Sequence, residues 1–210
     1  MTLRPSVAIF DYGIGNLRSA QKALEFAGAE VTLTNDKSIL KESDGVVLPG
    51  VGAFGRCAEA LIDSDLFALA AAMAKEAASG CKPFLGICIG MQLLATEGKE
   101  KGNHKGLGWI KGKVIKIKKI KKIKIPHMGW NTVKVISKHP ILKRKKFESY
   151  FVHSYNFICE DKKNILGTCD YNKRITAIVG KENIIGTQFH PEKSQKIGLE
   201  ILKNFVSWNY

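Results

Sequence analysis

The chain has 210 residues, 45% of them hydrophobic, with 20 Gly and 6 Pro, which is typical of one globular domain with a sizeable core. Its five cysteines are scattered without a Cys-x-x-Cys pair, so we expect a reducing cytoplasm and no disulfide framework, and the longest apolar stretch (84–95) falls far short of the roughly 20 residues that span a bilayer. The net charge of +14 comes from residues 101–210, with 24 Lys and Arg against 7 Asp and Glu, whereas residues 1–100 have 9 against 12.

In the first half of the chain, short apolar runs alternate with helical patterns. The runs at 7–11, 30–34, 45–48 and 82–87 predict buried strands. Leu17, Ala20, Leu24 and Ala27 recur at helical spacing up to Gly28, and the alanine-rich segment 56–78 predicts a second helix. Strands that alternate with helices in this way form a mostly parallel sheet with helices on both faces.

In the second half, from about Trp109, the pattern changes to short β-rich segments, and a helix from about Ser194 to Trp208 follows them. No internal repeat or linker divides the chain. We therefore expect one α/β domain over residues 1–210, with antiparallel strands added to the sheet in its second half. The β-rich segments lie at 109–118, 121–126, 131–136, 147–152, 155–160, 164–171, 174–179 and 184–189.

Much of the positive charge lies in the segment 111–124, where Ile and Val alternate imperfectly with Lys. Alternation with a period near two indicates strands with one solvated face, and lysine on that face discourages edge-to-edge pairing. A basic segment is also compatible with an acidic partner surface or with nucleic acid. No aromatic residue that could stack on a base is interleaved there, so we favour the solvated face and expect no nucleic-acid partner.

Cys88 lies between an apolar run that ends at Gly86 and a helix-forming run that begins near Gly90. This pattern predicts a strand, a tight turn and a helix, with the thiol at the apex of the turn. Backbone N–H groups at the start of a helix favour a thiolate and can hold an oxyanion. Taken alone, the pattern fits a catalytic cysteine and a packed core thiol equally well.

Two further segments carry residue types that a cysteine nucleophile needs. Pro49-Gly50-Val51-Gly52 follows a strand end, and its glycines allow successive N–H groups to converge on an anion, although an ordinary turn has the same composition. His190 and Glu192 follow another strand and lie two residues apart, so that in an extended chain they share one face and the carboxylate can orient the ring. A histidine at a strand end is more often a surface or core residue.

Together these residues supply a nucleophile, an oriented base and an anion-binding turn, which suits acyl transfer through a thioester. The other histidines are also candidates for a base. No two of them have the spacing of metal ligands, so we assign no metal and no cofactor. They are His104, His127, His139 and His153.

With these residues placed, the chain resembles the class I glutamine amidotransferases, in which a Cys-His-Glu triad occurs in this order, and most closely the glutaminase subunits of imidazole glycerol phosphate synthase. The shared motifs follow the family order over nearly the whole chain, and PGVGAF and PHMGWN separate this subfamily from other glutaminases. The basic segment 111–124 is the departure from the family pattern. The motifs are DYGIGN (11–16), LPGVGAF (48–54), LGICIGMQLL (85–94), GLGWI (106–110), PHMGWN (126–131), YFVHSY (150–155) and GTQFHPEKS (186–194).

The resemblance implies a flavodoxin-like α/β fold and the hydrolysis of L-glutamine to glutamate and ammonia. In relatives, the cysteine attacks the side-chain amide, the histidine moves the proton, and the glutamate orients the histidine. Carried over by motif, the nucleophile is Cys88, the base His190 and its orienter Glu192. The oxyanion hole involves Ile89 and the Gly50-Val51-Gly52 loop, and the amino-acid end of glutamine contacts Gln92, Ser154 and Tyr155.

The resemblance also implies a heterodimer, since relatives pass ammonia to a (β/α)-barrel cyclase subunit that makes imidazole glycerol phosphate and an aminoimidazole carboxamide ribotide in histidine biosynthesis. Positions that match the joint with that subunit are Asn16, Trp130, Tyr150 and Lys193. Two alternatives stay open. One is a paralogue that feeds ammonia to a cyclase-like partner in another pathway, such as nucleotide-sugar amidination, and the other is a nucleic-acid-binding or scaffolding protein with a vestigial triad.

Overall fold

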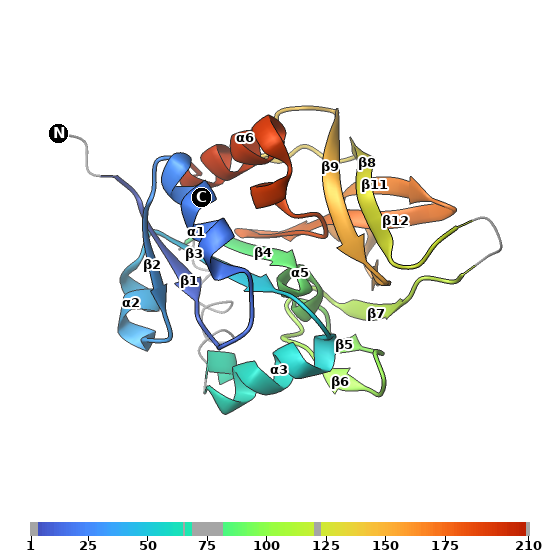
Figure 1. Cartoon of the computed structure of the whole chain (residues 1–210), viewed down its shortest axis with the longest axis horizontal. Coiled ribbons are helices and arrows are strands. Elements are labelled where there is room, and N and C mark those ends of the chain that lie inside the picture. The colour runs from blue at the N-terminus through green and yellow to red at the C-terminus, as the bar shows by residue number, and fades with distance from the viewer. Residues whose placement is uncertain (1–3, 65, 69–81, 120–122, 209–210) are drawn as a thin grey trace.

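A computed structural model of the chain describes residues 4–64, 66–68, 82–119 and 123–208 (Figure 1). Over these residues the chain forms a nine-stranded sheet and a smaller four-stranded sheet. The strands of the large sheet, in spatial order, are β2 (Glu30–Thr34), β1 (Ser6–Phe10), β3 (Gly45–Gly50), β4 (Phe84–Cys88), β13 (Ile184–Thr187), β12 (Lys173–Lys181), β11 (Ile165–Tyr171), β8 (His127–Val135) and β9 (Lys146–His153).

The large sheet is parallel from β2 to β13 and antiparallel from β13 to β9. Its parallel strands β3, β4 and β13 are buried along their whole length, as strands covered on both faces must be. In β9, by contrast, buried and more exposed residues alternate, which is typical of an antiparallel strand with one solvated face. This confirms the predicted α/β class with antiparallel additions.

The helices cover the large sheet from both sides (Figure 1). α1 (Leu17–Phe26) packs against α6 (Gln195–Val206), and α3 (Phe54–Asp63) packs against the short α5 (Ile89–Leu93), which also contacts β3, β4 and β13. A further short helix, α2 (Lys37–Glu42), was not predicted; the Asp36 side chain accepts a hydrogen bond from the Ser38 N–H at its start. Among the described residues, no helix combines the length and apolar character needed to cross a membrane.

The four-stranded sheet was not predicted as a separate unit. Its order is β10 (Tyr155–Cys159), β7 (Gly112–Lys116), β5 (Glu97–Gly98) and β6 (His104–Lys105). The sequence indicates β7 and β10, but β5 and β6 have two residues each and are too short to carry a periodicity. Buried residues of this small sheet, such as Val114 and Phe157, belong to one continuous hydrophobic core with those of the parallel strands.

Two other predicted elements differ from the structure. At the place of the helix predicted over 56–78, the structure has α3, which begins at Phe54 and ends at Asp63. Most of the remaining predicted range lies outside the described residues. The strand predicted over 121–126 begins outside the described residues, and residues 123–126 form no strand because β8 starts only at His127. In the basic segment, Val114 and Ile117 are buried while Lys113 and Lys116 are exposed, which confirms a solvated lysine face there.

Candidate active site

Cys88 lies at the apex of the predicted turn between β4 and α5. Its backbone has φ 56°, a left-handed conformation that is strained for a residue with a side chain. The flanking glycines permit this turn, since a Cβ at Gly90 would lie 1.8 Å from the Leu48 carbonyl oxygen and a Cβ at Gly86 would lie 2.7 Å from the Gly90 carbonyl oxygen. The strand-turn-helix prediction is therefore correct, and the close approach of α5 to β3 and β4 explains both glycines.

His190 follows β13, the strand that pairs in parallel with β4, and Cys88 is the last residue of β4, so the two residues lie at the carboxyl ends of neighbouring strands. The His190 Nδ1 atom is 2.7 Å from Glu192 Oε1, and both side chains are at least 95% buried. The contact was predicted from an extended chain, but Glu192 lies in the 3₁₀ turn η2 (Pro191–Lys193). The turn, rather than strand alternation, brings the carboxylate to the ring.

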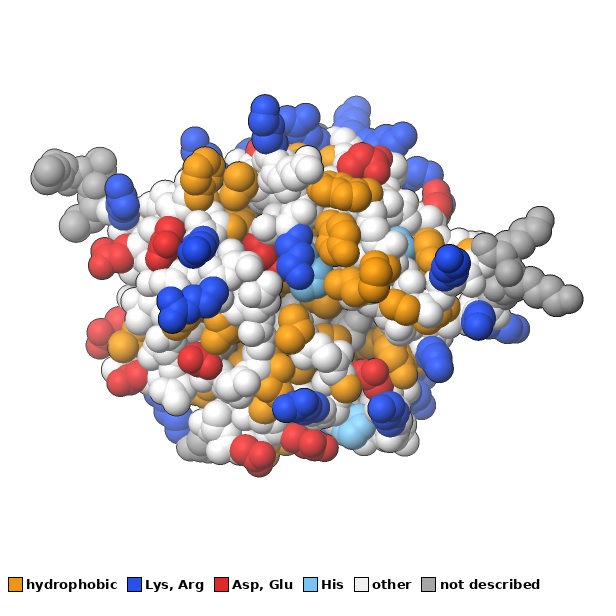
Figure 2. All heavy atoms as spheres, viewed as in Figure 1, with side chains coloured by type: hydrophobic (Ala, Val, Ile, Leu, Met, Phe, Trp, Pro, Cys, Tyr) orange, Lys and Arg blue, Asp and Glu red, His pale blue; other side chains and the backbone are white. Residues whose placement is uncertain are grey.

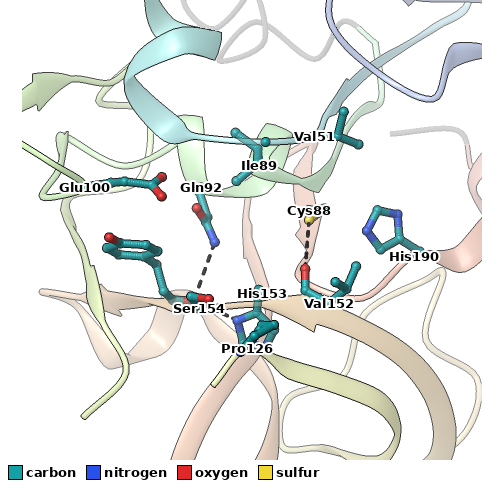
Figure 3. A pocket seen from close by; sticks show the side chains of 12 residues that line it. Val51, Cys88, Ile89, Gln92, Glu100, Pro126, Val152, His153, Ser154 and His190 are labelled. Carbon is teal, nitrogen blue, oxygen red and sulfur yellow. Dashed lines mark hydrogen bonds between the residues drawn. The ribbon is translucent and has the colours of Figure 1, made fainter. Parts of the chain in front are cut away.

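The ring of His190 is turned toward the sulfur of Cys88 (Figure 3). Burial by itself disfavours the protonated ring, but hydrogen bonds and charge interactions with Cys88 and Glu192 outweigh burial and raise the pKa of His190 to about 10. The Cys88 Sγ atom also lies 3.9 Å from the Val152 carbonyl oxygen and 3.8 Å from Gln188 Nε2. Sulfur, imidazole and carboxylate thus form one connected group.

The loop after β3 runs beside Cys88, because Gly50 is the register partner of Cys88 between β3 and β4. Gly52 has φ 93°, which favours glycine. Two buried side chains hold the loop: the Tyr12 hydroxyl donates to the Pro49 carbonyl oxygen at 2.6 Å, and the Cys57 Sγ donates to the Val51 carbonyl oxygen at 3.4 Å. The structure therefore places the predicted oxyanion loop next to the sulfur.

A cavity of about 320 Å³ opens over Cys88 (Figure 3). Its lining comes from β4, α5, β9 and β10, from the loops after β3 and β5, and from the segments before β8 and after β13. Of the residues predicted to be nucleophile, base, oxyanion hole and glutamine contacts, all but Gly50 line it: Val51, Gly52, Cys88, Ile89, Gln92, Ser154, Tyr155 and His190. Within the described ranges, no three His, Cys, Asp or Glu side chains come together as a metal site would require.

Gln92 lies on α5 one turn after Cys88 and is 1% exposed. Its Nε2 donates to Gln188 Oε1 at 2.9 Å and, more weakly, to the Tyr155 carbonyl oxygen at 3.5 Å. Its Oε1 is buried at the cavity without a hydrogen-bond partner among the described residues. A buried amide oxygen normally has a donor, so this atom can receive a donor group from a ligand.

Two residues of the site, one behind the cavity wall and one facing the cavity, escaped the sequence analysis. Gln188 stands in the motif GTQFHPEKS but drew no attention because it is not ionisable; it is fully buried and connects Gln92 to Cys88. Glu100 faces the cavity, and its Oε2 accepts from the Phe54 N–H at 2.7 Å across 46 residues of chain. Nothing in the local sequence around Glu100 indicates this position.

The residues predicted at a partner joint lie in β8, β9 and η2 and just before α1. Trp130 and Tyr150 are register partners in β8 and β9 with ring centroids 6.1 Å apart, and Trp130 is 48% exposed. Lys193 is exposed in η2, which contacts both β9 and α1, the helix that Asn16 precedes. Figure 2 shows hydrophobic side chains across the centre of the visible face, with Lys and Arg around much of its outline. The place of these residues at a partner joint stays a prediction.

Comparison with known proteins agrees with this geometry. The family described as glutamine amidotransferase class-I matches residues 8–208. The imidazole glycerol phosphate synthase subunit HisH of Rhodopseudomonas palustris is 45% identical over 97% of this chain and 99% of its own length. That of Zymomonas mobilis subsp. mobilis is 46% identical over 97% and 96%.

Among solved structures, PurLQS from Thermotoga maritima shares the fold with a TM-score of 0.72, at 21% identity over 98% of this chain and 99% of the other. At that identity the likeness concerns the fold alone. The full-length similarity at 45–46% identity is more specific. The chain belongs to the class I glutamine amidotransferase family and, within it, to the HisH subunits of imidazole glycerol phosphate synthase.

Proposed function

We propose that this chain is the glutaminase subunit of an imidazole glycerol phosphate synthase in histidine biosynthesis, and that it hydrolyses L-glutamine to glutamate and ammonia. The observation that carries the proposal is the group formed by Cys88, His190 and Glu192 at the rim of the parallel sheet, beside a cavity. The names of the relatives favour this pathway over a paralogue in nucleotide-sugar amidination. The intact triad argues against a scaffolding or nucleic-acid-binding protein.

In the first step, the Cys88 thiolate attacks the side-chain amide carbon of glutamine. The tetrahedral oxyanion is held by the N–H of Ile89 and that of Val51 or Gly52. The carbon–nitrogen bond breaks as protonated His190 gives its proton to the leaving nitrogen, which departs as ammonia and leaves a glutamyl thioester. The hydrogen bond to Glu192 keeps the ring oriented for this transfer.

In the second step, the neutral imidazole of His190 takes a proton from a water molecule, which attacks the thioester carbonyl. The carbon–sulfur bond breaks, glutamate leaves, and the sulfur and the imidazole return to their starting states. Burial of both side chains of the His190–Glu192 pair favours this chemistry because electrostatic interactions are stronger when water is excluded.

The cavity also has groups suited to the amino-acid end of glutamine. The unpartnered Gln92 Oε1 and the carboxylate of Glu100 are acceptors for the α-ammonium group. Ser154 and Tyr155 lie on the same wall and supply polar atoms for the α-carboxylate. Because Gln92 and Glu100 both offer acceptors to an α-ammonium group, the cavity favours a zwitterionic amino acid over an amide that lacks this group.

We further propose one domain over residues 1–210, located in the cytoplasm, that forms a heterodimer with a (β/α)-barrel cyclase subunit. The single hydrophobic core and the free thiols of Cys57, Cys88, Cys159 and Cys169 support the domain and the compartment. The exposed aromatic ring of Trp130 supports a docking surface near the site. Ammonia released into water would be protonated and lost as a nucleophile, so a docked synthase has a direct advantage.

The test is synthesis by the complex with its cyclase subunit, driven either by glutamine or by ammonia. Cys88→Ala should abolish glutamine-driven synthesis, while ammonia-driven synthesis by the cyclase survives. Cys169→Ala, which removes another fully buried thiol, is the matched control and should keep both activities. Glutamate release should be low for the isolated subunit and should rise with the cyclase and its ribonucleotide. Glutamine use retained by Cys88→Ala would exclude Cys88 as the nucleophile.

A further inference from the structure

Two buried histidines that the proposed reaction does not use face each other next to the cavity. His127 begins β8 and His153 ends β9, and the antiparallel register makes them direct cross-strand partners. Partners of this kind lie on the same face of a sheet. The His127 Nδ1 and His153 Nε2 atoms are 2.9 Å apart, and the residues are 2% and 6% exposed.

The hydrogen bonds of this pair have only one possible direction. His153 Nδ1 lies 2.7 Å from the Tyr155 carbonyl oxygen, which can only accept, so His153 Nδ1 carries the proton. In a neutral ring the Nε2 of His153 then accepts, and the donor is the Nδ1–H of His127. The Nε2 of His127 accepts in turn from the amide Nδ2 of Asn131 at 3.1 Å.

The orientation of the Asn131 amide is set by two other contacts. Its Oδ1 accepts from the Thr132 N–H at 2.7 Å, and its Nδ2 also donates to the Asp170 carbonyl oxygen at 3.0 Å. The chain of hydrogen bonds therefore runs from Asn131 through His127 and His153 to the Tyr155 carbonyl. It requires both rings to be neutral Nδ1–H tautomers, because a second proton on either ring would place one donor against another.

The surroundings keep both rings neutral. His127 is stacked between Phe151 and Tyr171, with ring centroids 4.7 and 4.0 Å away. Burial lowers the pKa of His127 to about 4. Burial, partly opposed by the Tyr155 hydrogen bond, lowers the pKa of His153 to about 3. Neither ring is suited to proton transfer at neutral pH, which leaves a structural use for their hydrogen bonds.

The last acceptor in this series of hydrogen bonds, the Tyr155 carbonyl oxygen, belongs to a residue that lines the cavity. The Tyr155 carbonyl oxygen also accepts from Gln92 Nε2, and Tyr155 and Ser154 both line the cavity beside Gln92. We propose that His127 and His153 are positioning residues for the substrate, whose directed hydrogen bonds hold the Ser154–Tyr155 segment and Gln92 in the arrangement that binds the amino-acid end of glutamine. This inference rests on the proposed function, since it takes glutamine as the ligand of the cavity.

The first test reads the two tautomers directly in the full-length wild-type protein. Long-range nitrogen–hydrogen correlation spectra of ¹⁵N-histidine-labelled protein at pH 7 should give Nδ1–H signals for His127 and His153. His139 is an internal control, because its Nδ1 accepts from the Ile141 N–H and it should be the Nε2–H tautomer. An Nε2–H tautomer or a protonated ring at either position of the pair would overturn the proposal.

The second test measures glutaminase kinetics in the complex with the cyclase subunit. His127→Phe keeps an aromatic ring between Phe151 and Tyr171 but removes the donor to His153, so the KM for glutamine should rise about threefold to tenfold with kcat nearly unchanged. His127→Asn keeps an N–H near the position of Nδ1 and should recover most of this loss. His139→Phe, which alters a buried histidine elsewhere, should leave KM unchanged.

Two results are then distinguishable. An active wild type whose KM for glutamine is unchanged in His127→Phe, or equal in His127→Phe and His127→Asn, would refute the positioning role and leave the proposed function standing. A wild-type complex without glutaminase activity would refute the proposed function, and this inference with it.

Discussion

Gly90 offers a sharp test of how tightly the turn around Cys88 is packed. A Cβ at position 90 would lie 1.8 Å from the Leu48 carbonyl oxygen, whereas real contacts of this kind are essentially never shorter than 3.0 Å. In Gly90→Ala, α5 and β3 must therefore separate by more than 1 Å. Neither side can yield by a side-chain rotation, because Leu48 contributes backbone and β3 is paired with β1 and β4.

The cost of this substitution follows from its backbone contact. Overpacking a core typically costs 1–3 kcal/mol, and a clash with a central strand belongs at the upper end, about 3 kcal/mol. For a protein of this size, that lowers the melting temperature by about 6–12 °C. The shift also moves Cys88, and a misplacement of about 1 Å at a reacting atom costs on the order of 100-fold in rate.

Gly45→Ala is the matched control, because Gly45 is a buried glycine in β3, the strand against which Gly90 packs. A Cβ there would meet its nearest neighbour, a ring carbon of Phe205, at 3.6 Å, which is an ordinary contact. Calorimetric melting and glutamine-driven synthesis should be near wild type for Gly45→Ala and strongly reduced for Gly90→Ala. A Gly90→Ala protein with the melting temperature and turnover of the wild type would refute the tight packing of this turn.

Three further predictions concern pH, substrate and partner. Burial disfavours protonated His190, but Cys88 and Glu192 raise its pKa from 6.5 to about 10. The contribution of protonated His190 to the free energy of unfolding is therefore complete below pH 6.5 and is lost as pH rises through about 10. In denaturant titrations, Glu192→Gln should flatten this loss, and an unchanged pH profile would contradict it. Gln92→Leu removes the unpartnered Oε1 and should raise the KM for glutamine about tenfold with ammonia-driven synthesis intact, so an unaltered KM would count against it. Trp130→Ala removes a half-exposed ring and should weaken binding of the cyclase subunit at least about tenfold by calorimetry, without a change in melting temperature; equal affinities would remove Trp130 from the interface.

Local sequence was sufficient for the parts of the site that depend on nearby residues. The turn at Cys88 follows from an apolar run, two glycines and a helix-forming run within about a dozen residues. The contact between His190 and Glu192 joins residues two apart, although the structure makes it through a 3₁₀ turn and not an extended strand. Both features are encoded where they occur, because backbone sterics and short-range hydrogen bonds dominate over such distances.

Tertiary structure decided which distant segments meet. The pairing of β4 with β13 brings Cys88 and His190 together across about a hundred residues, and the same pairing inserts Gln188 between Gln92 and the sulfur. The register of β8 and β9 aligns His127 with His153. A shift by one residue would have sent the two rings to opposite faces. Register of this kind is set by the packing of whole strands against the core, so no short stretch of sequence contains it.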